Sequence, residues 1–247
     1  MTSTWDIFEK QIEKEFSNNP ESFLSQPTIR KTVHSFNKKI MKELYNRVNQ
    51  DQRLSLIKDP AIGKPTLSKH GYSQSTLRTL YYIKELESNN IHINEINHIT
   101  EIGAGYGNFC RIIKKLGYSD SHFLVDLDIM HKIQKKFLSK TCNLENLIFN
   151  KINKELIPPT TNSLFYATFS LNELPIIERQ KLENTYNNYK YIFIVFNKEF
   201  PVSENIKIDN EVYFEKLKIN LDKSHNVKIY KNNGLNGNIL IGKRNDV

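Results

Sequence analysis

The sequence feature that most constrains the fold is a short apolar strand that runs directly into a glycine-rich turn. Residues 98–117 read HITEIGAGYGNFCRIIKKLG, and the apolar segment His98–Ile102 is followed by Gly103, Gly105 and Gly107. Glycine lets the backbone turn sharply and lets a ligand approach it closely, and the helix that follows offers unpaired N–H groups at its start. The pattern predicts a strand–turn–helix unit of an α/β fold with a ligand site at the turn.

The spacing of these glycines separates two kinds of ligand site. A dinucleotide site needs glycines in the pattern G-x-G-x-x-G. The third glycine would fall on Asn108 if the count began at Gly103, and on Cys110 if it began at Gly105. Glu101, two residues before the first glycine, would repel a pyrophosphate but can pair with an ammonium group. We therefore expect an amino-acid-like ligand with a cationic sulfonium rather than a dinucleotide.

From about residue 97 onward, short apolar segments alternate with amphipathic helical patterns. This alternation predicts right-handed crossovers and a parallel sheet that is covered on both faces. After the fifth strand we expect a helix over Val212–Leu221 and two more strands, Val227–Tyr230 and Ile239–Gly242, joined through NNGLNG, which contains two Asn-Gly hairpin signals. We predict an α/β, Rossmann-like, doubly wound sheet of seven strands, five parallel and two in a C-terminal antiparallel hairpin. The parallel strands are expected at His98–Ile102, His122–Val125, Leu147–Phe149, Leu164–Phe169 and Tyr191–Phe196.

The N-terminal part of the chain has a helical pattern instead. Apolar residues recur at steps of three and four from Trp5 to Phe16, as on one face of an amphipathic helix, and a second helix is expected over 37–56. We predict a helical N-terminal extension over residues 1–95 that caps a second domain over residues 96–247.

Composition narrows the setting in which the protein works. The two cysteines, Cys110 and Cys142, lie in ordinary segments and indicate a reducing compartment. The N-terminus has no signal-peptide pattern, and the longest apolar run, Tyr191–Phe196, is far shorter than a membrane helix, so we expect a cytoplasmic protein with no membrane partner. The net charge of +8 does not predict a nucleic-acid partner, because only seven of the 35 basic residues are Arg and the lysines are spread along the chain.

Acidic residues end the second predicted strand, in the segment LVDLD. Asp126 lies 21 residues after Gly105. An acidic residue at about this distance, at the end of the second strand, can accept hydrogen bonds from both hydroxyls of a ribose. We therefore expect Asp126 to hold a ribose, and Asp128 to cap the helix that begins at Ile129.

Taken in order, the segments GKPTLSKHGYSQSTLRTLYYIKEL, EIGAGYGNFCRII, LVDLD and ATFSLNELP resemble class I S-adenosylmethionine-dependent methyltransferases. Among these they are similar to a sugar O-methyltransferase family of bacterial enzymes that have a helical N-terminal part. The resemblance covers roughly residues 20–200. Its first motif is specific for the cofactor, and the remaining motifs are moderately specific for the substrate. It implies an enzyme that transfers a methyl group from S-adenosylmethionine to a hydroxyl of a sugar-like small molecule.

The resemblance also implies where the cofactor and the base lie. The loop Lys64–Gln74 would cover the cofactor and help to close the site. Two residues stay open as the base that accepts the hydroxyl proton, Glu173 at the end of the fourth strand and His70 in the loop. No metal site is predicted, because no carboxylate or histidine cluster has a ligand spacing. The expected cofactor-binding residues are Glu101, Gly103, Ala104, Gly105, Gly107, Asp126, Asn150 and Ser170.

Two other functions stay open beside this one. The basic charge allows an RNA methyltransferase with the same cofactor, although the Asp/Asn-Pro-Pro-aromatic stretch and the Pro-Cys nucleophile of two nucleic-acid methyltransferase classes are absent. A methyltransferase-like fold retained for protein binding is the other alternative. The sequence leaves a homodimer open and does not identify the acceptor.

Overall fold

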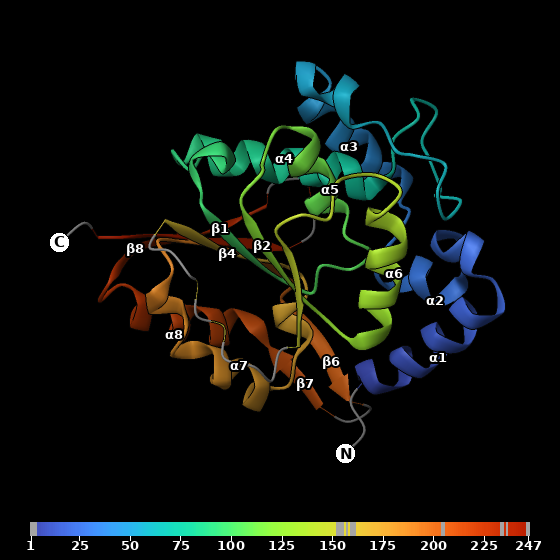
Figure 1. Cartoon of the computed structure of the whole chain (residues 1–247). Coiled ribbons are helices and arrows are strands. Elements are labelled where there is room, and N and C mark those ends of the chain that lie inside the picture. The colour runs from blue at the N-terminus through green and yellow to red at the C-terminus, as the bar shows by residue number, and fades with distance from the viewer. Residues whose placement is uncertain are drawn as a thin grey trace.

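A seven-stranded mixed sheet lies at the centre of the molecule, which is described here from a computed structural model (Figure 1). Its strands are β1 (His98–Ile102), β2 (Ser121–Val125), β3 (Leu147–Asn150), β4 (Ser163–Thr168), β5 (Tyr191–Phe196), β8 (His225–Lys231) and β9 (Asn238–Arg244). The order is β3-β2-β1-β4-β5-β9-β8; the first five strands are parallel, and β9 runs antiparallel to both of its neighbours. The structure describes residues 4–151, 156, 158, 162–203, 206–232, 235 and 237–245.

The predicted sheet is confirmed, and the differences lie at strand ends and in one extra strand pair. A separate antiparallel pair, β6 (Glu199–Ser203) and β7 (Ile206–Asp209), follows the fifth strand and was not expected. The hairpin strands β8 and β9 are each longer than the sequence pattern suggested. Of the two Asn-Gly pairs predicted to join them, the pair at 233–234 lies outside the described residues, as does residue 236 of the second pair.

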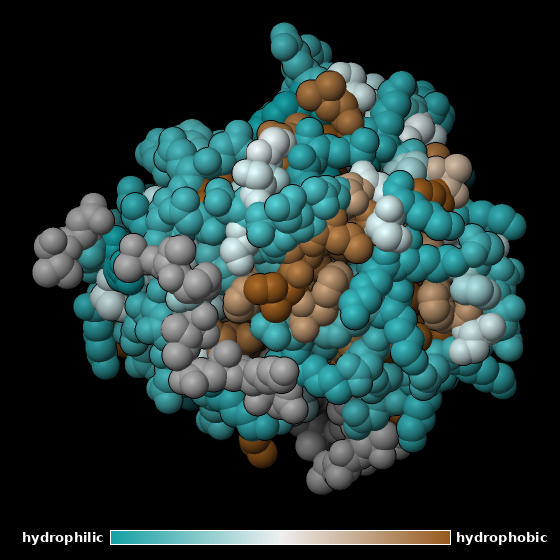
Figure 2. Space-filling model, viewed as in Figure 1, coloured by the Kyte–Doolittle hydropathy of each residue, from teal (hydrophilic) through white to brown (hydrophobic). Residues whose placement is uncertain are grey.

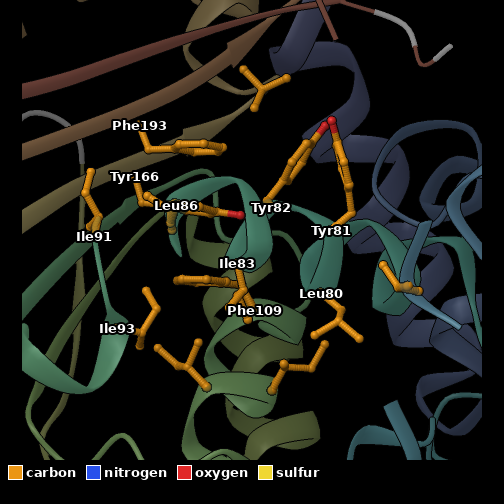
Figure 3. Close-up of a cluster of buried hydrophobic side chains, with 14 of the residues drawn as sticks. Leu80, Tyr81, Tyr82, Ile83, Leu86, Ile91, Ile93, Phe109, Tyr166 and Phe193 are labelled. Atoms are coloured by element: carbon orange, nitrogen blue, oxygen red, sulfur yellow. The ribbon is translucent and has the colours of Figure 1, made fainter. Parts of the chain in front are cut away.

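Helices cover both faces of the sheet, as the alternating pattern requires. Figure 1 shows α4 (Gln74–Ser88) and α5 (Asn108–Lys115) on one face and α7 (Ile176–Glu183) and α8 (Asn210–Leu221) on the other. Each face has its own buried apolar cluster. In the first cluster the rings of Phe109, Tyr166 and Phe193 lie almost parallel, with centroids 4.0 and 5.4 Å apart (Figure 3). This stack ties α5 to the central strands.

The N-terminal segment is helical but divided differently from the prediction. Its helices before α4 are α1 (Thr4–Asn18), α2 (Pro27–Thr32) and α3 (Lys38–Val48). The second helix therefore ends at Val48, because Asp51 caps a separate 3-10 helix with its carboxylate. The 3-10 helices lie at Pro20–Ser25, Gln52–Ile57, Ile93–Glu95, Leu171–Glu173 and Tyr186–Asn188.

A third apolar cluster joins these N-terminal helices to the sheet domain. Ile12 and Phe23 are fully buried, and the ring of Phe23 packs edge-on against Phe137 of α6 (Asp128–Leu138). Helix α1 contacts α2, α6 and β6, so it lies beside the end of the sheet at which the chain leaves β1 and β2. The division into two domains at residue 95 stays a prediction.

The visible surface is mostly hydrophilic. Figure 2 shows teal residues over most of this face, with a limited brown area near its middle. Among the described residues, no helix has the length and the apolar content needed to cross a membrane.

Candidate functional site

A cavity of about 510 Å³ opens where the carboxyl ends of β1, β2 and β4 meet. This volume is in the range of small-molecule and cofactor sites, and the position is the edge at which open α/β sheets bind ligands. Residues at and after the ends of the three strands form the base of the cavity, and α1, α2 and α4 contribute further parts of its wall. The wall includes Trp5, Glu9, Thr32, Val33, Ser35, Ser75, Arg78, Thr79, Tyr82, Glu101, Gly103, Ala104, Gly105, Asp126, Asp128, Lys151, Tyr166, Thr168, Phe169, Ser170 and Glu173.

The glycine turn after β1 needs glycine for two separate reasons. Gly103, Gly105 and Gly107 have φ angles of +68°, +56° and +88°, a region that residues with a Cβ rarely adopt. At Gly103 there is also no room, because an added Cβ would lie 2.2 Å from Cβ of Ser170. The Ser170 hydroxyl donates a hydrogen bond to the carbonyl of Ile102. Ser170 therefore packs on the turn and helps to fix its shape.

Glu101 places a carboxyl group in the wall of the cavity at the end of β1. Only 5% of the residue is exposed, and burial raises the pKa of this carboxyl well above its ordinary value. Its Oε2 atom lies 3.0 Å from Nε2 of His122, but no hydrogen bond satisfies that oxygen within the described part of the chain. Burial also lowers the pKa of His122 to about 3, so the imidazole supplies no positive charge at neutral pH. Because Glu101 itself is part of the cavity wall, its carboxyl group can face a cationic N–H group of a ligand there.

Asp126 joins the second strand to the glycine turn. Its Oδ2 atom accepts a hydrogen bond from the backbone N–H of Gly105 at 2.9 Å and another from the side chain of Gln134 at 3.1 Å. Its Oδ1 atom accepts the backbone N–H of Leu127 at 2.9 Å. Burial raises the pKa of Asp126 to about 7, although these donors oppose the rise. Because each carboxylate oxygen has two lone pairs, the group retains acceptor capacity toward the cavity.

Asp128 does not cap the following helix, which corrects the sequence prediction. The helix begins at Asp128 itself, its N-cap residue is Leu127, and no side chain caps it. The carboxylate of Asp128 is exposed and lies 2.5 Å from Nζ of Lys151, and this lysine lowers the pKa of the carboxyl. The pair forms the cavity wall beyond β2 and β3.

Glu173 reaches the cavity from the 3-10 helix after β4 and is bonded to the N-terminal helix. Nε1 of Trp5 donates a hydrogen bond to Oε2 of Glu173 at 2.9 Å. Burial raises the pKa of Glu173 to about 7, and the Trp5 bond opposes the rise only in part. Glu173 does not cap the next helix, because Pro175 is the N-cap of α7. A carboxyl whose pKa is near 7 is suited to accept a proton at neutral pH.

A buried arginine holds the loop that carries Glu173. The guanidinium of Arg179 donates hydrogen bonds to the carbonyls of Asn172 and Leu174, on either side of Glu173, and at 2.7 Å to Oδ1 of Asn210. The side chain is fully buried among the described residues and no carboxylate there pairs with it, so burial lowers its pKa to about 10. Arg179 therefore holds this loop in one position.

The structure does not bring every predicted residue to the cavity. His70 is exposed and stacks on Tyr45 with ring centroids 4.1 Å apart, and neither residue is part of the cavity wall. Asn150 accepts the backbone N–H of Asp126 through its carbonyl, but its side chain is not in the wall. Gly107 lies behind the wall, where an added Cβ would be 3.1 Å from Leu138.

The N-terminal cover of the cavity comes from other segments than expected. No residue of the loop Lys64–Gln74 is in the wall; α1, α2 and the N-terminal half of α4 take that place. Sequence reasoning therefore missed Trp5 and Arg78 as wall residues. In the sequence, these two residues are marked only by lying in amphipathic helical patterns. Helical periodicity does not tell which side chain faces a cavity and which faces the core. Among the described residues, no group of three or more His, Cys, Asp or Glu side chains is arranged to hold a metal ion.

The comparisons with solved structures agree with this architecture. The fold is similar to the methyltransferase domain of bacterial CtHen1-CN, with a TM-score of 0.50 and 11% identity over 67% of this chain and 97% of that chain. It is also similar to the PH0226 protein from Pyrococcus horikoshii OT3, with a TM-score of 0.51 and 11% identity over 70% of this chain and 92% of that chain. A SAM dependent methyltransferase from Aquifex aeolicus has a TM-score of 0.47 and 15% identity over 84% of this chain and 98% of that chain.

The first two likenesses show the fold alone. The chain has the fold of a class I methyltransferase domain. Neither the protein-family models nor the curated proteins match the sequence.

Proposed function

We propose that the protein is an S-adenosylmethionine-dependent O-methyltransferase that acts on a hydroxyl of a small, sugar-like molecule. The observation that carries the proposal is one cavity whose wall contains Glu101, Asp126 and Glu173, each at the end of a different strand. When bound, S-adenosylmethionine supplies an electrophilic methyl group. The rest of the chemistry is assigned to side chains of this chain.

Two carboxyl groups would hold the two ends of the cofactor. The carboxyl group of Glu101, which is part of the cavity wall, is suited to accept a hydrogen bond from an ammonium group, and binding of that cation would favour the ionised carboxylate. Asp126 is suited to accept hydrogen bonds from ribose hydroxyls, while its bond to the Gly105 N–H keeps the carboxylate beside the turn. Gly103, Ala104 and Ser170 would shape the surface between these two groups.

Glu173 is the better supported candidate for the base. It lies in the cavity wall, its raised pKa keeps it basic enough to accept a hydroxyl proton, and Trp5 fixes its orientation. His70 lacks a comparable position, since it stacks on Tyr45 outside the wall. Positioning of the acceptor oxygen would supply most of the rate acceleration, and proton removal would add to it.

The size and charge of the cavity favour a small acceptor over RNA. Helices α1 and α2 contribute to the wall, and the volume of about 510 Å³ has to hold both cofactor and acceptor. The described wall contains five carboxyl groups, of Glu9, Glu101, Asp126, Asp128 and Glu173, against two basic side chains. A wall with two basic side chains, one of them paired with Asp128, offers few contacts to the phosphates of a polyanionic chain.

Calorimetry with S-adenosylhomocysteine tests the cofactor assignment. The wild-type protein should bind it with a sub-millimolar Kd, and Asp126→Asn should weaken binding about tenfold through loss of charge-assisted hydrogen bonds. Asp128→Asn is the matched control, because Asp128 lies two residues further along the chain and pairs with Lys151. If the folded wild type shows no heat of binding at millimolar ligand, the proposal fails. If only the control variant loses affinity, the ribose site belongs to Asp128.

Methyl transfer tests the catalytic assignment separately. The protein is incubated with methyl-labelled S-adenosylmethionine and a panel of monosaccharides and nucleotide sugars, and label in the acceptor is counted. Glu173→Gln should retain cofactor binding and lose most of the transfer rate, whereas His70→Gln should transfer like the wild type. Cofactor binding without transfer to any acceptor, including RNA, would favour a non-catalytic binding protein.

A further inference from the structure

Arg78 is the basic side chain on the β4 side of the cavity, and nothing in the assignment above uses it. It lies on α4, is half-buried and is part of the cavity wall. Among the residues that the structure describes, no carboxylate pairs with its guanidinium, and no hydrogen bond to it is found. A guanidinium has five N–H donors in a planar fork, a geometry that matches a carboxylate.

The ring of Phe169 holds this guanidinium in place. The Cζ atom of Arg78 lies 5.1 Å from the centroid of the Phe169 ring, which is a cation–π contact. Phe169 has a φ angle of +65°, which is strained for a bulky side chain and points to a site where the surroundings impose the conformation. Its backbone N–H donates to the carbonyl of Val195 at 2.7 Å, and its ring packs against Gly237. The Phe169 ring is therefore held in place beside Arg78 without a ligand.

Neutral aromatic groups also lie near the arginine. Tyr82 and Tyr166, both in the cavity wall, are buried phenols whose pKa values burial raises and the positive charge of Arg78 lowers in part. At neutral pH both phenols are uncharged, so neither neutralises the guanidinium. Figure 3 shows Tyr82 beside the stack that contains Tyr166 and Phe193. Uncharged, buried rings near Arg78 lower the local dielectric constant, which strengthens its attraction for an anion.

We propose that Arg78 and Phe169 form a carboxylate-binding subsite at the β4 end of the cavity. The carboxylate has two sources that fit the proposed function, on which this inference rests. One is the amino-acid end of the cofactor, whose ammonium group is assigned to Glu101. The other is an acidic sugar acceptor, which would make the acceptor a uronic acid or a related sugar acid rather than a neutral sugar.

Calorimetry on the full chain separates the two sources. Ligands are S-adenosylhomocysteine and 5′-methylthioadenosine, which lacks the amino-acid end, followed by glucuronate and glucose added to the S-adenosylhomocysteine complex. If the cofactor supplies the carboxylate, Arg78→Met weakens S-adenosylhomocysteine about 10- to 100-fold and leaves methylthioadenosine unchanged. If the acceptor supplies it, Arg78→Met binds both cofactor analogues normally, and glucuronate binds the wild-type complex but not the variant complex, with glucose inert in both.

Matched variants keep the test independent of folding. Arg47 lies over the Tyr81 ring at 5.3 Å and pairs with Glu43, but it is outside the cavity wall, so Arg47→Met should bind every ligand like the wild type. Arg78→Lys should recover part of the lost affinity, because it keeps the charge and loses the planar fork. Thermal unfolding of each variant shows whether it is folded.

Two results overturn the inference. One is an Arg78→Met protein that is folded and binds S-adenosylhomocysteine and glucuronate with wild-type affinity. The other is that Arg78→Met binds S-adenosylhomocysteine with wild-type affinity while the wild-type complex does not bind glucuronate. If the wild type binds no S-adenosylhomocysteine at all, the proposed function fails by itself. Glucuronate binding to the protein alone then decides the inference, and no binding overturns it.

Discussion

The titration of Glu173 should be visible in the fluorescence of Trp5. The chain has one tryptophan, and its indole N–H donates to the Glu173 carboxyl at 2.9 Å. The pKa of Glu173 rises from its ordinary value of 4.5 to about 7, mainly through burial. This difference corresponds to about 3 kcal/mol in favour of the protonated form. Trp5 emission should therefore change in one step with a midpoint near pH 7, because ionisation of the carboxyl strengthens the bond from the indole.

Three variants assign that step. Glu173→Gln should abolish it, because the amide does not titrate but still accepts the indole hydrogen bond. Asp126→Asn should retain it, although Asp126 also titrates near pH 7. Glu9→Gln should retain it too, which excludes the carboxyl one helical turn away from Trp5 on the same helix. A wild-type midpoint near pH 4.5, or a step that persists in Glu173→Gln, would show that burial does not raise the pKa of Glu173 in this way.

The same shift predicts how stability depends on pH. Because the folded state raises the pKa of Glu173, it binds more protons than the unfolded state between about pH 4.5 and pH 7. The contribution of Glu173 to the free energy of unfolding therefore falls as the pH rises through this window and stays low above it. Glu173→Gln should flatten the pH dependence and raise the unfolding temperature at pH 8 relative to the wild type. An unfolding temperature at pH 8 below that of the wild type would contradict this sign.

Three further predictions rest on other parts of the site. Gly103→Ala should lower the free energy of unfolding by about 2–4 kcal/mol, because the backbone is left-handed there and the added Cβ clashes with Ser170. Urea denaturation measures this loss, and Ser170→Gly should restore part of it in the Gly103→Ala protein. No restoration would mean that the clash is relieved elsewhere. Arg179→Met should lower the free energy of unfolding by about 2–4 kcal/mol in the same assay, because it leaves buried carbonyls without donors. An unchanged free energy of unfolding would mean that Arg179 does not hold this loop. The affinity for S-adenosylhomocysteine, measured by calorimetry, should fall about tenfold from pH 8 to pH 6 as Asp126 is protonated. The affinity of Asp126→Asn should not depend on pH in this range. A pH-dependent affinity in that variant would point to another titrating group.

The sheet and the glycine turn were predictable from local patterns. Strand periodicity, the glycine spacing and the position of Asp126 are encoded within short stretches, and the structure shows the expected five parallel strands with a C-terminal antiparallel pair and a hydrogen bond from Gly105 to Asp126. The strand pair β6–β7 was missed because Glu199–Ser203 contains a proline and lacks strict alternation.

The cover of the cavity was not predictable in the same way. Which helix lies over the site depends on packing between distant segments, such as Phe23 against Phe137 and Trp5 against Glu173, a bond across 168 residues. The sequence predicts amphipathic helices in the N-terminal segment, but it does not show against which part of the sheet they pack. His70 looked reactive as an isolated loop histidine, and its stacking on Tyr45 depends on a contact that no local pattern reveals.

The most direct test of the central claim is a crystal structure of the protein with S-adenosylhomocysteine. We expect the ligand in the cavity between β1 and β2, with ribose hydroxyls bonded to Asp126 and the amino group bonded to Glu101. Ligand bound elsewhere, or bound in the cavity with its ribose away from Asp126 and its amino group away from Glu101, would contradict the proposed cofactor site.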